Sequence, residues 1–321
     1  MSEVRVAMIG AGVMANRVHY PSLAGFSDVE LVGVCDLDRA RCEGTADRWG
    51  IPGRYADYRL MLDELRPDAV YAIGQPHLLF DVWVDVLRRR APLCIEKPMG
   101  ITLHQARILR HLAERGDVVT QVSFQRRSSP LLRVLRERCL ARGSVTQASC
   151  EFYKNQPGPF FNARDHMLDD CVHALDTVRW LCGGEVRRVQ SVSRALDTPD
   201  LNLIQALIEF DNGSTGVVLC NWTSGRRVFR AQIHAPGICA EADLDVGGRL
   251  FAAGDLAGEL LTAAEAARSE ELHRLGGFEA KNREFIDAVQ SGVPPESNFS
   301  DAYKTMELAE RILAANLLGP T

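Results

Sequence analysis

The strongest constraint on the fold lies near the start of the chain, where a short apolar run meets a glycine-rich turn. The segment MIGAGVMANRVHYPSL places Gly10, Gly12 and Ala15 after a predicted strand and at the beginning of a predicted helix. Gly10 would make the tight turn, Gly12 would let a pyrophosphate approach the backbone, and Ala15 would allow close helix packing. Because a helix N-terminus offers N–H groups to an anion, we expect a dinucleotide site that includes the loop residues Val13 and Met14.

The first 124 residues alternate short apolar runs with segments of helical periodicity, such as LHQARILRHLAERG. The apolar runs predict five strands: VRVAMIG, LVGVCD, DAVYAIG, PLCIEKP and VVTQVSF. Strands that alternate with helices form parallel sheets covered by helices. We therefore expect an α/β Rossmann domain that binds a dinucleotide over residues 1–124.

The pattern changes after residue 124. Helices are expected at about 130–139 and 166–181, and four later runs without helical segments between them predict strands: VRRVQSVSRAL, NLIQALIEF, STGVVLCNWTS and VFRAQIHA. The C-terminal segments FEAKNREFIDAVQSG and SDAYKTMELAERILAANLLG are helical in pattern, the second with Ser300 as N-cap. Residues 125–321 should form an α+β domain with a large, mostly antiparallel open sheet.

Composition narrows the class of partner. The 321 residues are 46% hydrophobic and carry a net charge of −5, which gives no basic field for nucleic acid or an anionic membrane. Small molecules fit this charge better. The start of the chain lacks the pattern of a signal peptide and no apolar stretch approaches the ~18 residues that span a bilayer, so we expect a cytoplasmic protein. The nine cysteines include no C-x-x-C pair, which favours reduced, buried thiols.

An acidic residue follows the second predicted strand. Asp36 lies 21 residues after Ala15, where a carboxylate can accept hydrogen bonds from the adenosine ribose. The same charge would repel a 2′-phosphate, so the sequence favours NAD over NADP. Arg39 could stack on adenine or meet a phosphate, or it could be a solvated arginine at the start of a helix.

The segment LCIEKPMG ends a predicted strand in Glu96, Lys97 and Pro98. Residues at the carboxyl ends of parallel strands face the ligand crevice of such folds. Pro98 disfavours helical geometry at Lys97 and so directs its ammonium out of the sheet, where Glu96 can hold or neutralise it. An ordinary ion pair at the end of a strand is the alternative.

A row of polar residues lies on the predicted helix at 166–181. His166, Asp169, His173 and Asp176 recur at spacings of three, four and three, which places them on one helix face. Such a row suits proton transfer, metal binding or a solvated stripe. Because no cysteine or further His/Glu cluster completes a metal shell, we favour proton transfer and expect no metal.

Together these motifs resemble those of the Gfo/Idh/MocA oxidoreductases over nearly the whole chain. The resemblance rests on GAGVMA at 10–15, E-K-P at 96–98, VSFQRRSSP at 122–130 ending in R-x-x-P, and the D-x-x-x-H-x-x-D of the predicted helix. It implies a Rossmann domain followed by an α+β domain whose open sheet mediates homodimers or homotetramers. It also implies an NAD(P)-dependent enzyme that oxidises a hydroxyl of a sugar, cyclitol or related compound.

The resemblance also implies residue roles. Lys97 would bind the reacting hydroxyl, Asp169 would orient the substrate, and His173 would be the general acid/base. This agrees with the chemistry, since a histidine titrates near neutral pH and a neighbouring ammonium stabilises a developing alkoxide. Gln75 and Pro76 occupy the place of the family's T-P pair, and we count them with Glu96 and Lys97 among the cofactor-binding residues.

Other positions depart from the family pattern or remain open. Cys171 replaces a glycine, FNARDHML replaces a glycine-rich approach to the helix, and Phe80 stands at a usual histidine position. His77, beside Pro76, could contact the nicotinamide side of the cofactor or the substrate, or it could be a surface histidine. Arg127 is a candidate for binding an anionic substrate group. Tyr153 is a candidate for stacking on a sugar ring, or else a core or interface residue.

The leading hypothesis is therefore a dehydrogenase of a small polyhydroxy compound. A second hypothesis keeps the same residues but uses transient NAD-dependent oxidation to cleave a glycoside. A third is a cofactor-binding regulator without catalysis, which would not need Lys97, Asp169 and His173 together.

Overall fold

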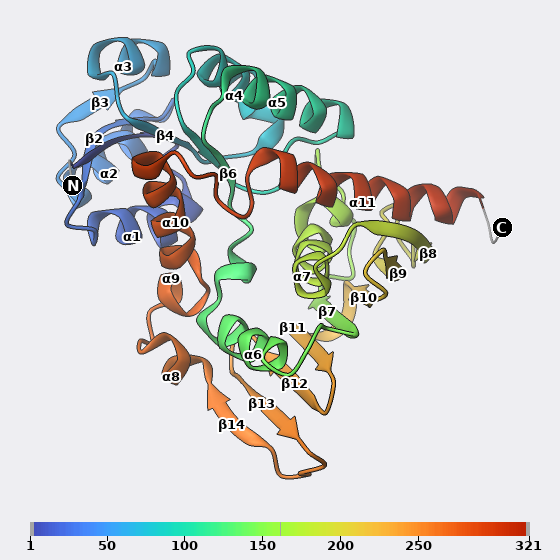
Figure 1. Ribbon diagram of the computed structural model, residues 1–321. Coiled ribbons are helices and arrows are strands. Elements are labelled where there is room, and N and C mark those ends of the chain that lie inside the picture. Colours follow the sequence, from blue (N-terminus) through green and yellow to red (C-terminus); the bar gives the residue numbers. More distant parts are fainter. Residues whose placement is uncertain (1–2, 161, 319–321) are drawn as a thin grey trace. The chain divides into compact units, whose positions relative to one another are not determined.

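The computed structural model describes residues 3–160 and 162–318 (Figure 1). The described residues divide into two compact units. The first contains residues up to 124 together with 278–303, and the second contains 125–277 together with the residues from 304 on. The sequence predicted the change at 124 and 125 but left 278–303 in the second domain.

The described part of the first unit contains a six-stranded parallel sheet in the order β3-β2-β1-β4-β5-β6. Its strands are β1 Val4–Ile9, β2 Val29–Cys35, β3 Gly53–Tyr55, β4 Ala69–Ala72, β5 Leu93–Ile95 and β6 Thr120–Val122. Its helices are α1 Tyr20–Ala24, α2 Arg39–Trp49, α3 Tyr58–Leu65, α4 Pro76–Arg88, α5 Leu103–Gly116 and α10 Phe278–Ser291. The Rossmann prediction is confirmed, while the short strand β3 was not predicted.

Strand order explains where a ligand can approach this sheet. β1 and β4 are neighbours, although the chain passes through β2 and β3 between them, so the order reverses at β1. All four residues of β4 are buried, as expected for a parallel strand covered on both faces. The crevice at such a reversal opens at the carboxyl ends of the strands, here directly after Ile9 and Ala72.

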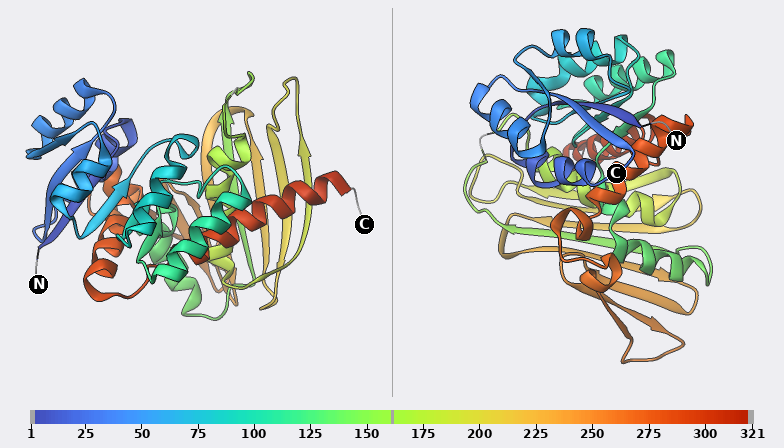
Figure 2. Two further views of the ribbon diagram at one scale, coloured as in Figure 1. Left: turned by 90° about the horizontal axis from the view of Figure 1, so that it is seen from above. Right: turned by 90° about the vertical axis from the view of Figure 1, so that its left-hand side faces the viewer.

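The second unit contains, over its described residues, an eight-stranded sheet in the order β14-β13-β12-β11-β7-β10-β9-β8. The strands are β7 Gln147–Asn155, β8 Val186–Arg194, β9 Leu203–Phe210, β10 Thr215–Asn221, β11 Thr223–Ala235, β12 Ile238–Asp243, β13 Gly247–Ala252 and β14 Glu259–Thr262. β7 and β10 pair in parallel, and the other neighbouring pairs described are antiparallel. Figure 2 shows these strands side by side. The mostly antiparallel sheet is thus confirmed, and β12 to β14 extend it beyond the predicted strands.

Helices cover one face of this sheet. α7 Val172–Cys182 packs on β7 and β10, and α6 Pro130–Leu140 packs on β11, β12 and β13. Ile204, Ile208 and alternate residues of the neighbouring strands are buried in this core. The residues that alternate with the buried ones on β9, such as Gln205 and Leu207, are accessible, so the other face of the sheet has the alternation typical of an open face.

Two short helices and one long helix complete the fold of the described residues. α8 Ala263–Ala267 and α9 Leu272–Leu275 follow β14, and α11 spans Phe299–Leu318. Asn298, rather than the predicted Ser300, caps α11, because its Oδ1 accepts the N–H groups of Ser300 and Asp301 at 3.0 and 3.1 Å. No helix among the described residues has the length and apolar character needed to cross a membrane.

α10 joins the first unit through a charged side chain. Arg283 contacts the Asp28 carboxylate at 2.7 and 3.1 Å, and Gln290 donates to the same carboxylate at 3.0 Å. Asp28 immediately precedes β2. The contact therefore connects a helix near the C-terminal end of the chain to the N-terminal half of the parallel sheet.

Asp28→Asn tests this contact. Hydrogen bonds from Arg283 hold the pKa of the Asp28 carboxyl below its ordinary value of 3.8. Such a group stabilises the fold above its unfolded-state pKa, and the stabilisation is lost as pH falls through the lower folded-state pKa. We expect the variant to lose about 1 kcal/mol of unfolding free energy at pH 7 and to show a weaker acid dependence in urea denaturation. Asp47→Asn, in an exposed pair with Arg54, is the control, and equal stability of the two variants would contradict the prediction.

Candidate active site

The glycine turn after β1 has the geometry that a bound pyrophosphate requires. Gly10 has a φ of +109°, and a Cβ there would lie 2.0 Å from the carbonyl oxygen of Ile73, so only glycine fits. At Gly12 a Cβ would meet nothing within 4 Å, which leaves the backbone open on that side. Ala15 is fully buried, as predicted for close helix packing. These residues fit the dinucleotide that the sequence predicted.

Val13 and Met14 belong to the same turn and are exposed large hydrophobic residues. The segment after them, Ala15–His19, is a π-helical turn that leads into α1. The two residues thus follow Gly12 directly in the chain and have accessible side chains.

Asp36 is held firmly at this turn. Its Oδ2 accepts the N–H of Ala11 at 2.8 Å, and its Oδ1 accepts the N–H of Asp38 at 2.8 Å. Arg41 Nη2 lies 3.3 Å from the same Oδ1. A carboxylate has about four lone-pair sites, so one position remains for a ribose hydroxyl in addition to these three contacts.

The predicted cofactor residue Arg39 points elsewhere. Its side chain is 89% exposed and pairs with Glu43 at 2.7 Å. The basic residue that contacts Asp36 is Arg41, which sequence reasoning did not identify. The signal was present, because Arg41 lies three residues after the N-cap Asp38 and so turns back toward the end of β2.

Gln75 and Pro76 follow β4, the neighbour of β1. Gln75 is exposed and extended, and α4 begins at Pro76. Since Ile73 contacts the Gly10 turn, these residues lie at the same edge of the sheet as the proposed cofactor turn. His77 is exposed and Phe80 half-buried on the first turns of α4.

Glu96 and Lys97 directly follow β5. Glu96 is buried, and its Oε1 lies 2.9 Å from Nε2 of His19. Its Oε2 accepts the backbone N–H of Lys97 at 3.3 Å, and the Lys97–Pro98 peptide bond is cis. Lys97 thus stands at the carboxyl edge of the parallel sheet, in the same unit as the glycine turn, as predicted.

In the second unit, the predicted helix begins as a π-helical turn, Met167–Cys171, and continues as α7. Asp169 lies on the turn and pairs with Arg164 at 2.6 Å. His173 is buried in the first turn of α7. Arg164 comes from the segment that replaces the family's glycine-rich approach, and it was not predicted as a site residue.

The four polar residues of the predicted row lie in different surroundings, and two of them are enclosed by other side chains. Asp176 is buried and pairs with both Nε and Nη2 of Arg127, with an Nε to Oδ2 distance of 2.6 Å. Thr305 donates to the same carboxylate at 3.0 Å. His166 is buried between two aromatic rings, and this burial lowers the pKa of its imidazole. Asp176 and His166 are therefore internal, and Asp169 and His173 remain as candidates.

Arg127 and Tyr153, which were predicted to bind substrate, lie apart from Asp169 and His173 in their contacts. Arg127 is buried with Asp176, so its guanidinium already has a bidentate carboxylate partner inside the unit. Tyr153 is half-buried on β7 and alternates with the inward-facing Phe152, which places it on the sheet face away from α7. We therefore assign Arg127 a structural role and leave Tyr153 out of the proposed site.

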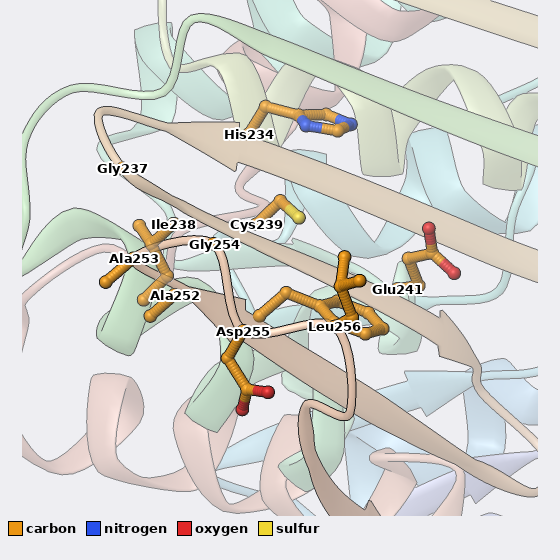
Figure 3. Close-up of a pocket in the computed structure, with 11 residues that line it drawn as sticks. His234, Gly237, Ile238, Cys239, Glu241, Ala252, Ala253, Gly254, Asp255 and Leu256 are labelled. Carbon is orange, nitrogen blue, oxygen red and sulfur yellow. The ribbon is translucent and has the colours of Figure 1, made fainter.

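A separate hollow lies on the second sheet (Figure 3). Its volume is about 510 Å³, and its lining comes from β11, β12, β13 and the loop that follows, including His234, Cys239, Glu241, Phe251 and Leu256. None of the predicted catalytic residues lines it. Within residues 3–160 and 162–318 no group of three His, Cys, Asp or Glu side chains is arranged to hold a metal ion.

Comparison with known proteins agrees with this architecture. Residues 4–124 match the model of an oxidoreductase family with an NAD-binding Rossmann fold, and residues 141–236 match the GFO/IDH/MocA C-terminal domain. The chain is 27% identical to the rhizopine catabolism protein MocA of Rhizobium meliloti, with 97% of this chain and 94% of the relative covered. It is 25% identical to scyllo-inositol 2-dehydrogenase (NAD(+)) of Bacillus subtilis, with 76% of this chain and 74% of the relative covered.

A solved structure shares the whole fold. The crystal structure of a dehydrogenase from Chromobacterium violaceum superimposes with a TM-score of 0.89 at 22% identity, and the match covers 99% of this chain and 96% of that one. With both domain models matched in order, the chain belongs to the Gfo/Idh/MocA family of NAD-binding oxidoreductases.

Proposed function

We propose that the protein is an NAD-dependent dehydrogenase of a small polyhydroxy compound, such as a sugar or cyclitol. The observation that carries this proposal is the glycine turn, where the backbone at Gly12 is open and Asp36 is anchored beside it. The presence of Lys97 at the same sheet edge supports catalysis over a purely regulatory role. The relatives named for rhizopine catabolism and for scyllo-inositol support the substrate class.

The residues of the chain divide the chemistry between them. NAD, when bound, supplies the acceptor for the hydride of the substrate carbon. Lys97 binds the hydroxyl oxygen and stabilises the negative charge that develops there. His173 takes the hydroxyl proton on a ring nitrogen, and Asp169 orients a neighbouring hydroxyl. Arg164 holds the Asp169 carboxylate in place for this contact.

Substitution of the proposed acid/base tests this function. We expect His173→Ala to lower kcat/KM for NAD⁺-dependent polyol oxidation by about 10²- to 10⁴-fold, because the variant lacks the proposed proton acceptor. Lys97→Ala should have a comparable effect through the lost alkoxide stabilisation. The measurement is NADH formation across a panel of inositols and hexoses, together with NAD⁺ binding by fluorescence.

His111→Ala is the matched control, since His111 is an exposed histidine on α5 without a proposed role. It should keep the wild-type rate. Full turnover by the His173 or the Lys97 variant would refute the assignment of roles. Cleavage of a glycoside without net NADH formation would instead support transient oxidation.

Asp36 should set the cofactor preference. Its charge favours a ribose diol and repels a 2′-phosphate, so Asp36→Ser should raise the ratio of kcat/KM for NADP⁺ to that for NAD⁺ by about tenfold or more. The measurement is the initial rate with each cofactor at saturating substrate. Arg39→Ala should leave the ratio unchanged because its side chain is solvated. An unchanged ratio in the Asp36 variant would contradict the proposed ribose contact.

The accessible face of the second sheet supports a homodimer or homotetramer. Val192 on β8 and Leu207 on β9 are exposed on this face, and their strands are neighbours. Apolar side chains on an open sheet face are commonly covered by a second subunit. Light scattering would measure the assembly.

A further inference from the structure

A buried histidine connects three segments of the first unit. His19 closes the π-helical turn that follows the glycine loop, and it is fully buried. Its Nε2 lies 2.9 Å from Glu96 Oε1 at the end of β5. Its Nδ1 lies 3.0 Å from Oδ1 of Asn282, a buried residue of α10. One imidazole thus connects three segments: the turn after the glycine loop, to which it belongs, the end of β5 before Lys97, and helix α10 from the C-terminal part of the chain.

The ring has little freedom to move. Tyr71 lies with its ring centroid 5.9 Å away at an angle of 59°, and Phe278 lies 6.1 Å away nearly edge-on at 81°. Both ring nitrogens are engaged, and aromatic groups pack beside the ring. A side chain enclosed in this way can hold its partners in a defined position.

The hydrogen bond between His19 and Glu96 is present in every arrangement of hydrogens that gives both ring nitrogens a partner. In the first arrangement, both ring nitrogens of His19 carry hydrogen and donate to Glu96 and Asn282. In the second, the Asn282 amide is turned by half a turn, so that its Nδ2 donates to Nδ1 of His19. In the third, a protonated Glu96 donates to Nε2 of His19. Within the described residues Asn282 Nδ2 has no other hydrogen-bond partner, which suits the half-turn. In each case a hydrogen bond joins Nε2 to Glu96 Oε1.

We propose that His19, supported by Asn282, is a positioning residue for the catalytic lysine. It fixes one oxygen of Glu96, so that the other oxygen accepts the Lys97 N–H and holds that peptide at the end of β5. The same side chain ties this peptide to the turn that follows Gly12. The inference rests on the proposed function of Lys97, and it explains why an acidic residue precedes that lysine.

Three variants separate positioning from packing. His19→Leu fills the space but removes both hydrogen bonds, whereas His19→Gln keeps an amide that can reach Glu96. Phe285→Leu is the packing control, because Phe285 is fully buried on α10 and its ring centroid lies 5.3 Å from that of Tyr71. Thermal unfolding confirms that each variant folds before it is compared.

The first measurement does not depend on catalysis. The chain has four lysines, so acetic anhydride labelling of the protein without cofactor can follow Lys97 by mass spectrometry, with Lys304 as the internal reference. We expect His19→Leu to change the relative labelling rate of Lys97 by about threefold or more, because the reactivity of a lysine follows its surroundings. His19→Gln and Phe285→Leu should stay within about twofold of wild type by the same criterion. An unchanged rate in His19→Leu would overturn the inference even if the enzyme is a dehydrogenase.

The second measurement is a double-mutant cycle on turnover. His19→Leu should lower kcat by about 10- to 100-fold, as displaced catalytic groups do, with little change in NAD⁺ affinity. In the Glu96→Gln background the same substitution should cost about threefold or less, because the histidine acts through that carboxylate. Fully additive effects, or a His19→Gln variant as slow as His19→Leu, would overturn the proposal. A wild-type protein without polyol turnover would refute the proposed function alone, and the labelling would still decide the positioning role.

Discussion

The close approach of Gly10 to Ile73 is the contact on which the first unit depends. Gly10 donates its N–H to Cys35 at the end of β2, and Ile73 donates to Ile9 at the end of β1. The three strand ends therefore converge at one point, and any side chain on Gly10 would collide with the Ile73 carbonyl. The open backbone of Gly12, the anchored Asp36 and the exposed Gln75 all take their positions from this convergence.

Charged groups in both units are held by partners before any ligand arrives. In the second unit Arg127 and Asp176 form a buried bidentate pair, while Arg164 pairs with the more accessible Asp169. Breaking a buried pair leaves an uncompensated charge, so the loss of either partner is strongly destabilising. With Asp176 paired to Arg127, Asp169 and His173 are the residues of this segment that keep their proposed roles. In the first unit, His19 performs the comparable task for Glu96.

Some residues misled the sequence analysis for identifiable reasons. Helical spacing placed His166, Asp169, His173 and Asp176 on one face, but spacing cannot show that Arg127 or Trp222 lies against two of them. Arg39 was predicted either to meet the cofactor or to be a solvated arginine, and its side chain is solvated, whereas helix geometry turns Arg41 toward Asp36. Strands β12 to β14 were not predicted, although β12 and β13 are longer than the predicted strands β5 and β6.

Local pattern alone determined the alternation of strands and helices, the glycine turn, the acidic end of β2 and the E-K-P segment, since each depends on residues close together in the chain. Tertiary structure decided which polar side chains are internal. Arg127 and Asp176 are 49 residues apart, and His19 and Asn282 are 263 apart, so no local pattern contains both partners. It also decided that residues 278–303 join the first unit, because the contacts of α10 with Asp28 and His19 form only when the chain returns to the parallel sheet.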